Sequence, residues 1–173
     1  RAALAPIAAW LAASGVPHVL LRNGWYVENF EGSVATALQI GMVPTSAGDG
    51  RFSAATRADY AAAAAVVLAS PDGHAGQVLE LAGSTSFSMD EFAAAVGRAA
   101  GRPIQGHHLG HEQYQAALEQ AGLPDFVAAI LADSDTAARD GWLQDDSRTL
   151  ERLIGRPTTP VTVMIDGIVK ATR

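Results

Sequence analysis

An α/β fold is predicted from the order in which strand-like and helix-like segments follow one another along the chain. Short apolar segments bounded by turn residues, which are typical of strands, lie mostly in the first half, and helical patterns fill the second half. The first predicted helix leads through a short loop into a strand, which is half of a βαβ unit. With 173 residues, of which 49% are hydrophobic, the chain is long enough to bury one core.

The first segment of the chain is predicted to be a helix and not a signal peptide or a membrane span. Its apolar residues recur at helical spacing, at Leu4, Ile7, Ala8 and Leu11. Gly15 follows at a position typical of a helix C-cap. Pro6 and Trp10 interrupt the apolar run, which is far shorter than the roughly 20 residues that cross a bilayer. Because the sequence starts within a helix and without Met, we expect further sequence upstream.

Strands are predicted where apolar runs are bounded by turn signals. Residues 17–22 form such a run, of the kind found in strands that are buried on both faces of a parallel sheet. Residues 78–81 and 104–109 are further strand candidates, and residues 51–55 are expected to be extended. The segment 22–30 follows the first strand and contains a glycine and two large aromatic residues. Since ligands of open α/β sheets bind beyond the carboxyl ends of the strands, this segment is a candidate binding site.

Helix boundaries are predicted from capping residues and from glycine and proline breaks. Thr56 with Asp59, and Ser88 with Glu91, have the form of capping boxes that begin two helices. These two helices are expected to end before Pro71 and at Gly101, and an earlier helix is expected to end at Gly41. Further helices are predicted over 114–121, 126–131 and 146–154, and a last helix is predicted to start at Thr159-Pro160.

The charge pattern argues against nucleic-acid binding. The formal net charge is −6, and the 12 basic residues, of which Lys170 is the only lysine, are spread from Arg1 to Arg173. The chain has no cysteine, which excludes disulfides and thiolate ligands or nucleophiles and is compatible with the cytoplasm. Any redox chemistry therefore needs a cofactor.

Common nucleotide-binding and catalytic motifs do not occur in the sequence. It has no G-x-G-x-x-G or Walker loop, and Gly48-Asp49-Gly50 is too short to cradle a pyrophosphate. None of Tyr26, Tyr60 and Tyr114 is followed by lysine four residues later, which excludes the Tyr/Lys proton relay of short-chain reductases. No serine lies in a nucleophile-elbow pattern, so serine hydrolase chemistry has no support.

No metal site is predicted, although two groups of residues suggest one at first. His107 and His111 lie four residues apart, but a strand-to-helix boundary between them breaks the shared helical face that this spacing needs. Five acidic residues could form a cation site: Asp133, Asp135, Asp140, Asp145 and Asp146. They lie among serine, glycine and helix starts, where aspartate commonly caps helices, so we expect solvated caps.

Residues 24–29 allow two interpretations that the residues alone leave open. In one, Trp25 and Tyr26 are core aromatics that cover the edge of a sheet. In the other, Gly24 lets the backbone approach a ligand and Tyr26 supplies a face for a flat ring, while Glu28 and Asn29 make polar contacts.

Several separated motifs resemble the NmrA-like atypical short-chain dehydrogenases/reductases, and among them most closely the type 2 NAD(P)H:quinone oxidoreductases. The resemblance rests on LRNGWYVEN at 21–29, AGDG at 47–50 and AATRADYA at 54–61. It continues through LAG at 81–83, GLPD at 122–125, ADSD at 132–135 and IGRPTT at 154–159. These segments cover nearly the whole chain in the family's order.

The resemblance implies the C-terminal part of a Rossmann-type parallel sheet, over residues 1–83, with a small, mainly helical substrate domain over 84–173. The family's glycine-rich phosphate loop belongs to a segment upstream of this sequence. The implied cofactor is NADPH, with NADH left open, and neither flavin nor metal is expected. By resemblance, the nicotinamide end of the cofactor is contacted by Gly24, Trp25, Tyr26, Val27, Glu28 and Asn29. The cofactor or substrate cleft is lined by Ser53, Ala54, Ala55 and Arg57.

The activity that the resemblance implies is reduction of a small-molecule quinone by direct hydride transfer. The protein supplies orientation in this scheme, and no catalytic residue is assigned. We expect a cytoplasmic protein without nucleic-acid or membrane partners, and a homodimer is left open. Two alternatives stay open beside the enzyme: an NmrA-like regulator that senses NAD(P) without turnover, and a truncated fragment without enzymatic function.

Overall fold

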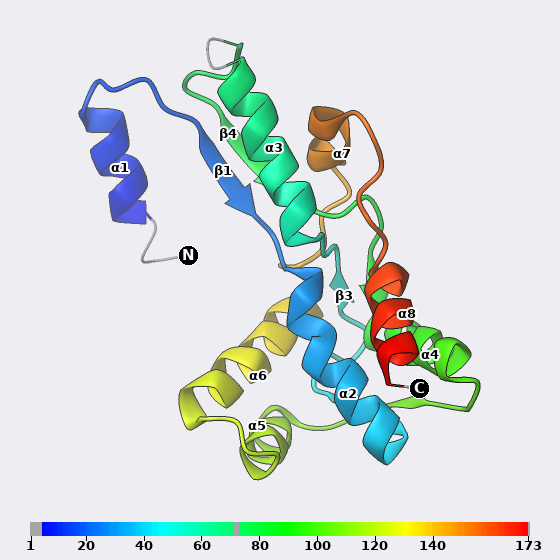
Figure 1. Cartoon of the computed structure of the whole chain (residues 1–173). Coiled ribbons are helices and arrows are strands. Elements are labelled where there is room, and N and C mark those ends of the chain that lie inside the picture. Colours follow the sequence, from blue (N-terminus) through cyan, green and yellow to red (C-terminus); the bar gives the residue numbers. More distant parts are fainter. Residues whose placement is uncertain (1–4, 71–72, 173) are drawn as a thin grey trace.

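The computed structural model describes residues 5–70 and 73–172 (Figure 1). Its helices are α1 (Ala5–Ala13), α2 (Glu31–Ile40), α3 (Arg57–Ala69), α4 (Met89–Ala100), α5 (His111–Gln120), α6 (Asp125–Arg139), α7 (Thr149–Ile154) and α8 (Val161–Ala171), with a 3-10 turn η1 at Val27–Phe30. Its strands are β1 (Leu20–Asn23), β2 (Met42–Thr45), β3 (Arg51–Phe52), β4 (Val78–Leu81), β5 (Phe87–Ser88) and β6 (Gln105–His108). Within the described part, no helix is long and apolar enough to span a membrane.

The strands pair in three two-stranded sheets, two of which are parallel. β1 pairs with β4, from Leu20 opposite Val78 to Asn23 opposite Leu81. β2 pairs in parallel with β6, and β3 pairs with β5 in antiparallel fashion. Helices connect the parallel partners, as the predicted α/β class requires. The fold class is therefore confirmed.

Within these 173 residues the first strand is covered on one face only, whereas burial on both faces is predicted for it. Leu21 and Leu79 lie opposite each other and pack into a small core beneath α3 and α7, together with Leu150. The next pair in the register, Arg22 and Glu80, forms an ion pair of 2.8 Å with both side chains about half exposed. Because successive side chains of a strand point to opposite faces, one face is covered and the other lies in solvent.

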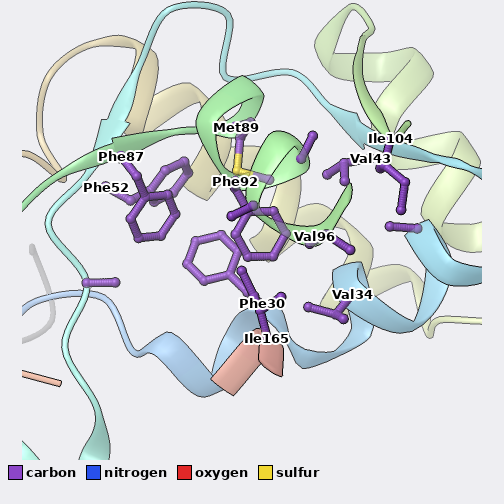
Figure 2. Packing of buried hydrophobic residues seen from close by; sticks show 14 of the residues in the cluster. Phe30, Val34, Val43, Phe52, Phe87, Met89, Phe92, Val96, Ile104 and Ile165 are labelled. Atoms are coloured by element: carbon purple, nitrogen blue, oxygen red, sulfur yellow. The ribbon is translucent and has the colours of Figure 1, made fainter. Parts of the chain in front are cut away.

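The larger core is built around four phenylalanines that come from η1, β3, β5 and α4 (Figure 2). The Phe30 ring lies 5.2 Å from the Phe52 ring and 5.3 Å from the Phe87 ring, both in edge-on contact. Phe92 stacks on Phe87, and Ile165 of α8 is buried in the same cluster. Residues from both sides of the predicted domain boundary between residues 83 and 84 contribute to this core. The domain boundary itself stays a prediction.

Both predicted helix caps are present. The Thr56 hydroxyl accepts a hydrogen bond from the Asp59 amide at 3.1 Å. Ser88 and Glu91 form a reciprocal capping box at the start of α4. Gly15 has a φ of +69° after the end of α1, as expected near a helix C-terminus. Leu4, the first apolar position of that helical pattern, lies outside the described residues.

Two strands were not predicted, and several helices differ in their bounds. β2 contains Pro44, a residue that normally argues against a strand, and β5 has only two residues. α5 begins earlier than predicted and α6 runs on to Arg139, because the intervening alanines and polar residues continue the helix. α7 begins at Thr149 and α8 at Val161, both later than predicted.

Candidate functional site

Backbone segments from three parts of the chain meet beyond the carboxyl ends of β1 and β4. The Gly24 amide donates to the Leu81 carbonyl at 2.8 Å, which extends the β1–β4 pairing by one step. The Gly83 amide donates to the Ser53 carbonyl at 2.8 Å. Residues that follow three different strands therefore lie side by side, as the position of the segment 22–30 predicted.

A second pair of hydrogen bonds joins the segment after β1 to the segment after β3. The Val27 amide donates to the Ala55 carbonyl at 3.0 Å, and the Ala55 amide donates to the Trp25 carbonyl at 3.1 Å. The Tyr60 hydroxyl also donates to the Trp25 carbonyl, at 3.3 Å. Burial raises the pKa of Tyr60, so this hydroxyl remains a donor at neutral pH. The backbone of Trp25 is thus held from two sides.

Two glycines allow this close approach of backbones. A Cβ atom at Gly83 would lie 2.1 Å from the Ala54 carbonyl oxygen, which no side chain tolerates. A Cβ atom at Gly24 would lie 3.0 Å from the Leu81 carbonyl oxygen and 3.3 Å from the Tyr60 hydroxyl. The absence of a side chain at both positions lets these backbone segments pack directly against one another.

A cleft of about 880 Å³ lies along this edge. Its walls come from the ends of β1 and β4, from Gly24, Trp25 and Ser53, and from residues 142–145 with Ala137 of α6. The Asp145 amide donates to the Ser53 hydroxyl at 3.0 Å, which fixes the loop 142–145 opposite the sheet edge. Sequence reasoning considered Asp145 of this loop only as a member of an acidic cluster and did not predict that the loop faces the sheet edge, because that placement depends on a contact with the distant Ser53.

Trp25 also lines a second, smaller pocket of about 150 Å³. This pocket lies among α2, α5 and α6 and is bounded by core side chains that include Phe30 and Phe52. Asn29 lines it as well. Of the predicted cofactor contacts, Gly24 and Trp25 therefore line the cleft, whereas Trp25 and Asn29 line the small pocket.

Tyr26 is not among the residues that line the cleft or the small pocket. Its ring makes an edge-on contact with Tyr60 at 5.3 Å, and the Arg57 guanidinium lies 5.2 Å from the centre of the ring. The side-chain amide of Asn23 donates a hydrogen bond to the Tyr26 hydroxyl at 3.2 Å. These contacts match the interpretation in which Tyr26 covers the sheet edge, and its contact with a cofactor stays a prediction.

The five other predicted site residues make local contacts or are buried in the structure. One Glu28 carboxylate oxygen accepts a hydrogen bond from the Arg57 amide at 2.9 Å, which satisfies a free amide at the start of α3. The side chains of Val27, Ala54 and Ala55 are buried. Val27 and Ala55 therefore offer no surface to a ligand in this structure, and Ala54 offers very little.

The expectation that all five clustered aspartates are solvated caps is wrong for Asp135. Its side chain is only 6% exposed in the middle of α6. One carboxylate oxygen accepts hydrogen bonds from the Thr45 hydroxyl and the Ser46 amide, both at 2.7 Å. Burial raises the pKa of Asp135, and these hydrogen bonds only partly offset the effect. Partners at the end of β2 thus replace water around this carboxyl group.

Histidines and acidic residues do not assemble into a metal site within the described residues: no three of them come together in a way that could hold an ion. His111 instead lies 3.1 Å from the Thr136 hydroxyl. His108 lies 3.0 Å from Asp90.

Comparison with known proteins identifies the relationship. No protein-family model matches the chain. Over 158 residues it is 49% identical to quinone oxidoreductase 2 of Escherichia coli strain K12, across 91% of this chain and 55% of that protein. The chain is a homologue of part of this quinone oxidoreductase. It spans about half the length of the curated relatives it matches.

Solved structures agree with the homology to quinone oxidoreductase 2. The crystal structure of that NADPH-dependent protein from E. coli, complexed with NADPH, matches with a TM-score of 0.88 and 46% identity over 92% of this chain and 56% of that one. The Citrobacter sp. triphenylmethane reductase complexed with NADP(H) matches with a TM-score of 0.83 and 29% identity, over 94% of this chain and 55% of that one.

A more distant structure shares the fold alone. The negative transcriptional regulator NmrA in complex with NAD matches with a TM-score of 0.54 and 11% identity, over 91% of this chain and 54% of that one. The homology to quinone oxidoreductase 2 confirms the predicted resemblance to a quinone oxidoreductase, and the structural match to it confirms the predicted α/β, Rossmann-type fold.

Proposed function

We propose that the complete protein reduces quinones with NADPH by direct hydride transfer, and that this chain supplies the site for the nicotinamide end and the quinone. The observation that carries the proposal is the cleft beyond the carboxyl ends of β1 and β4, the edge at which open α/β sheets bind ligands. The homology to quinone oxidoreductase 2 supports this assignment. No flavin or metal is needed for the scheme.

The residues of the cleft fit a flat ring that carries an amide. Its volume of about 880 Å³ lies in the range of cofactor sites. Leu21, Trp25 and Leu143 provide apolar walls, while Asn23 and Gln144 provide side-chain amides that donate and accept hydrogen bonds. We infer that these five residues hold and orient the nicotinamide.

The chain's contribution to the chemistry is orientation and shielding from water. A bound reduced nicotinamide would supply a hydride, which with one proton from water converts a quinone into a hydroquinone. Lys170, the only lysine, is on α8 and is not among the residues lining the cleft. A Tyr/Lys relay is not required, because a quinone accepts a hydride readily. Fixing the two reactants in contact is therefore the main task of the site.

The test follows NADPH absorbance after adding 1,4-benzoquinone to the purified protein, with NADPH binding recorded by fluorescence in parallel. We expect turnover, and Trp25→Ala should lower kcat/KM at least about tenfold because it removes a wall that orients the rings. Trp10→Ala is the matched control, since Trp10 is 72% exposed on α1. Its kcat/KM should stay within about twofold of the wild type.

Two results would contradict the proposal in different ways. NADPH binding without turnover would favour the regulator that senses NAD(P). Neither binding nor turnover in the complete protein would mean that it does not reduce quinones with NADPH.

A further inference from the structure

The small pocket beside Trp25 has an exposed mouth and a buried interior. Asn29, Gly32 and Ala121 line it and are exposed, so they mark the mouth. Phe52 and Tyr114 line it and are buried, so they mark the interior. Figure 2 shows Phe52 and Phe30 within the aromatic core that backs this pocket. The pocket is therefore a defined hollow open to solvent at one end.

We propose that this pocket binds the ring of a single-ring para-quinone and thereby restricts the substrate to benzoquinones. The inference rests on the proposed function and names the substrate class for the same site. Trp25 lines both the cleft and the small pocket, so a quinone ring in the pocket and a nicotinamide in the cleft would both lie against this side chain.

The volume of the pocket matches one six-membered ring. It measures about 150 Å³, and an engineered apolar cavity of about 150 Å³ in another protein binds benzene. Two fused rings need more room than this. Since the interior is lined by side chains of the closely packed aromatic core, it cannot widen without a cost in packing.

Polar groups at both ends of the pocket suit the two opposite oxygens of a para-quinone. At the mouth, the exposed Asn29 carries an amide with two N–H donors. In the interior, the buried Tyr114 contributes a phenol hydroxyl that can donate a hydrogen bond, and Asp135 contributes a buried carboxyl group. A pocket with an apolar middle and a polar group at each end therefore suits a flat ring that carries an oxygen at each of two opposite positions.

The mouth can be blocked without disturbing the core. Gly32 lies in the first turns of α2, and a Cβ atom there would meet no atom within 4 Å outside its own helix. Ala121 lines the pocket from the end of α5. Gly32→Leu and Ala121→Leu should therefore fold normally and narrow the mouth from two different helices. Gly167 of α8 also has open space at its Cβ position but lines no part of the pocket, so Gly167→Leu is the matched control.

Two measurements test the proposal. The first is binding of hydroquinone to the chain without cofactor, by ligand-observed NMR. We expect Gly32→Leu and Ala121→Leu to weaken binding at least about tenfold, and Gly167→Leu to leave it within about twofold. The second is NADPH-dependent turnover. The wild type should have at least about tenfold higher kcat/KM for 1,4-benzoquinone than for 1,4-naphthoquinone, and both blocking variants should raise KM for benzoquinone.

The outcomes separate this inference from the proposed function. Unchanged hydroquinone binding in both blocking variants, or equal use of one-ring and two-ring quinones, would overturn the pocket assignment while leaving quinone reduction intact. Loss of hydroquinone binding in Gly32→Leu and Ala121→Leu would support the pocket assignment even if the protein showed no NADPH turnover.

Discussion

Replacing Asp59 with alanine should destabilise the protein by about 3 kcal/mol at neutral pH. Asp59 is fully buried in the first turn of α3, where it accepts hydrogen bonds from the Thr56 hydroxyl and the Thr159 amide, both at 2.8 Å. Arg156 pairs with it at 2.7 Å. Removing one partner of a buried ion pair costs about 3–5 kcal/mol. The lower value applies because the Arg156 side chain is 51% exposed and can be solvated again.

The pH dependence tests whether the charge of Asp59 is responsible. Burial raises the pKa of Asp59, but hydrogen bonds from Thr159, Thr56 and Arg156 outweigh it and leave the pKa below its ordinary value of 3.8. The stabilisation by the ionised carboxylate is therefore fully present above pH 3.8 and is lost as the pH falls through the lowered pKa. The stability difference between the wild type and Asp59→Ala should shrink in acid.

Urea unfolding followed by circular dichroism measures this difference at about pH 7 and about pH 3. Thermal unfolding at neutral pH should show a Tm lowered by roughly 6–12 °C for a chain of this size. Asp166→Ala, at an exposed position of α8, is the control and should change the free energy of unfolding by less than about 0.5 kcal/mol. A loss below about 1 kcal/mol for Asp59→Ala, or an equal loss at both pH values, would refute the reasoning.

Two further variants test other parts of the structure. Asp135→Asn keeps an oxygen that can accept a hydrogen bond from Thr45 but removes the charge. Since the pKa of Asp135 is raised in the folded protein, ionisation of this carboxyl group lowers the free energy of unfolding of the wild type as the pH rises. Urea unfolding should show that this variant gains stability relative to the wild type between about pH 4 and pH 8, and a constant difference would contradict the raised pKa. Gly83→Ala should cost about 2 kcal/mol or more, because its Cβ atom would lie 2.1 Å from the Ala54 carbonyl oxygen. Gly167→Ala should instead stabilise by about 0.5–1 kcal/mol, and similar Tm shifts for the two glycine variants would disprove the close approach.

Local features of the structure were predictable because they depend on contacts between near neighbours in the sequence. The cap of α3 joins Thr56 to Asp59, and the capping box of α4 joins Ser88 to Glu91. The α/β class and the place of the segment 22–30 beyond a strand follow from similar short-range patterns. For the candidate site, this reasoning placed Gly24 and Trp25 directly after a strand, and both line the cleft, while their contact with a cofactor stays a prediction.

The opposite wall of the cleft and the small pocket depend on contacts between distant parts of the chain. Asp135 looked like a solvated cap in the sequence, yet its partner Thr45 lies 90 positions away and comes within reach only when α6 packs on the end of β2. The loop 142–145 likewise faces the sheet because Asp145 binds Ser53 across 92 positions. The sequence by itself determined the local elements, the capping contacts and one edge of the site. Only the tertiary structure decided which polar groups are buried and which side chains enclose a pocket, since both depend on how the elements pack together.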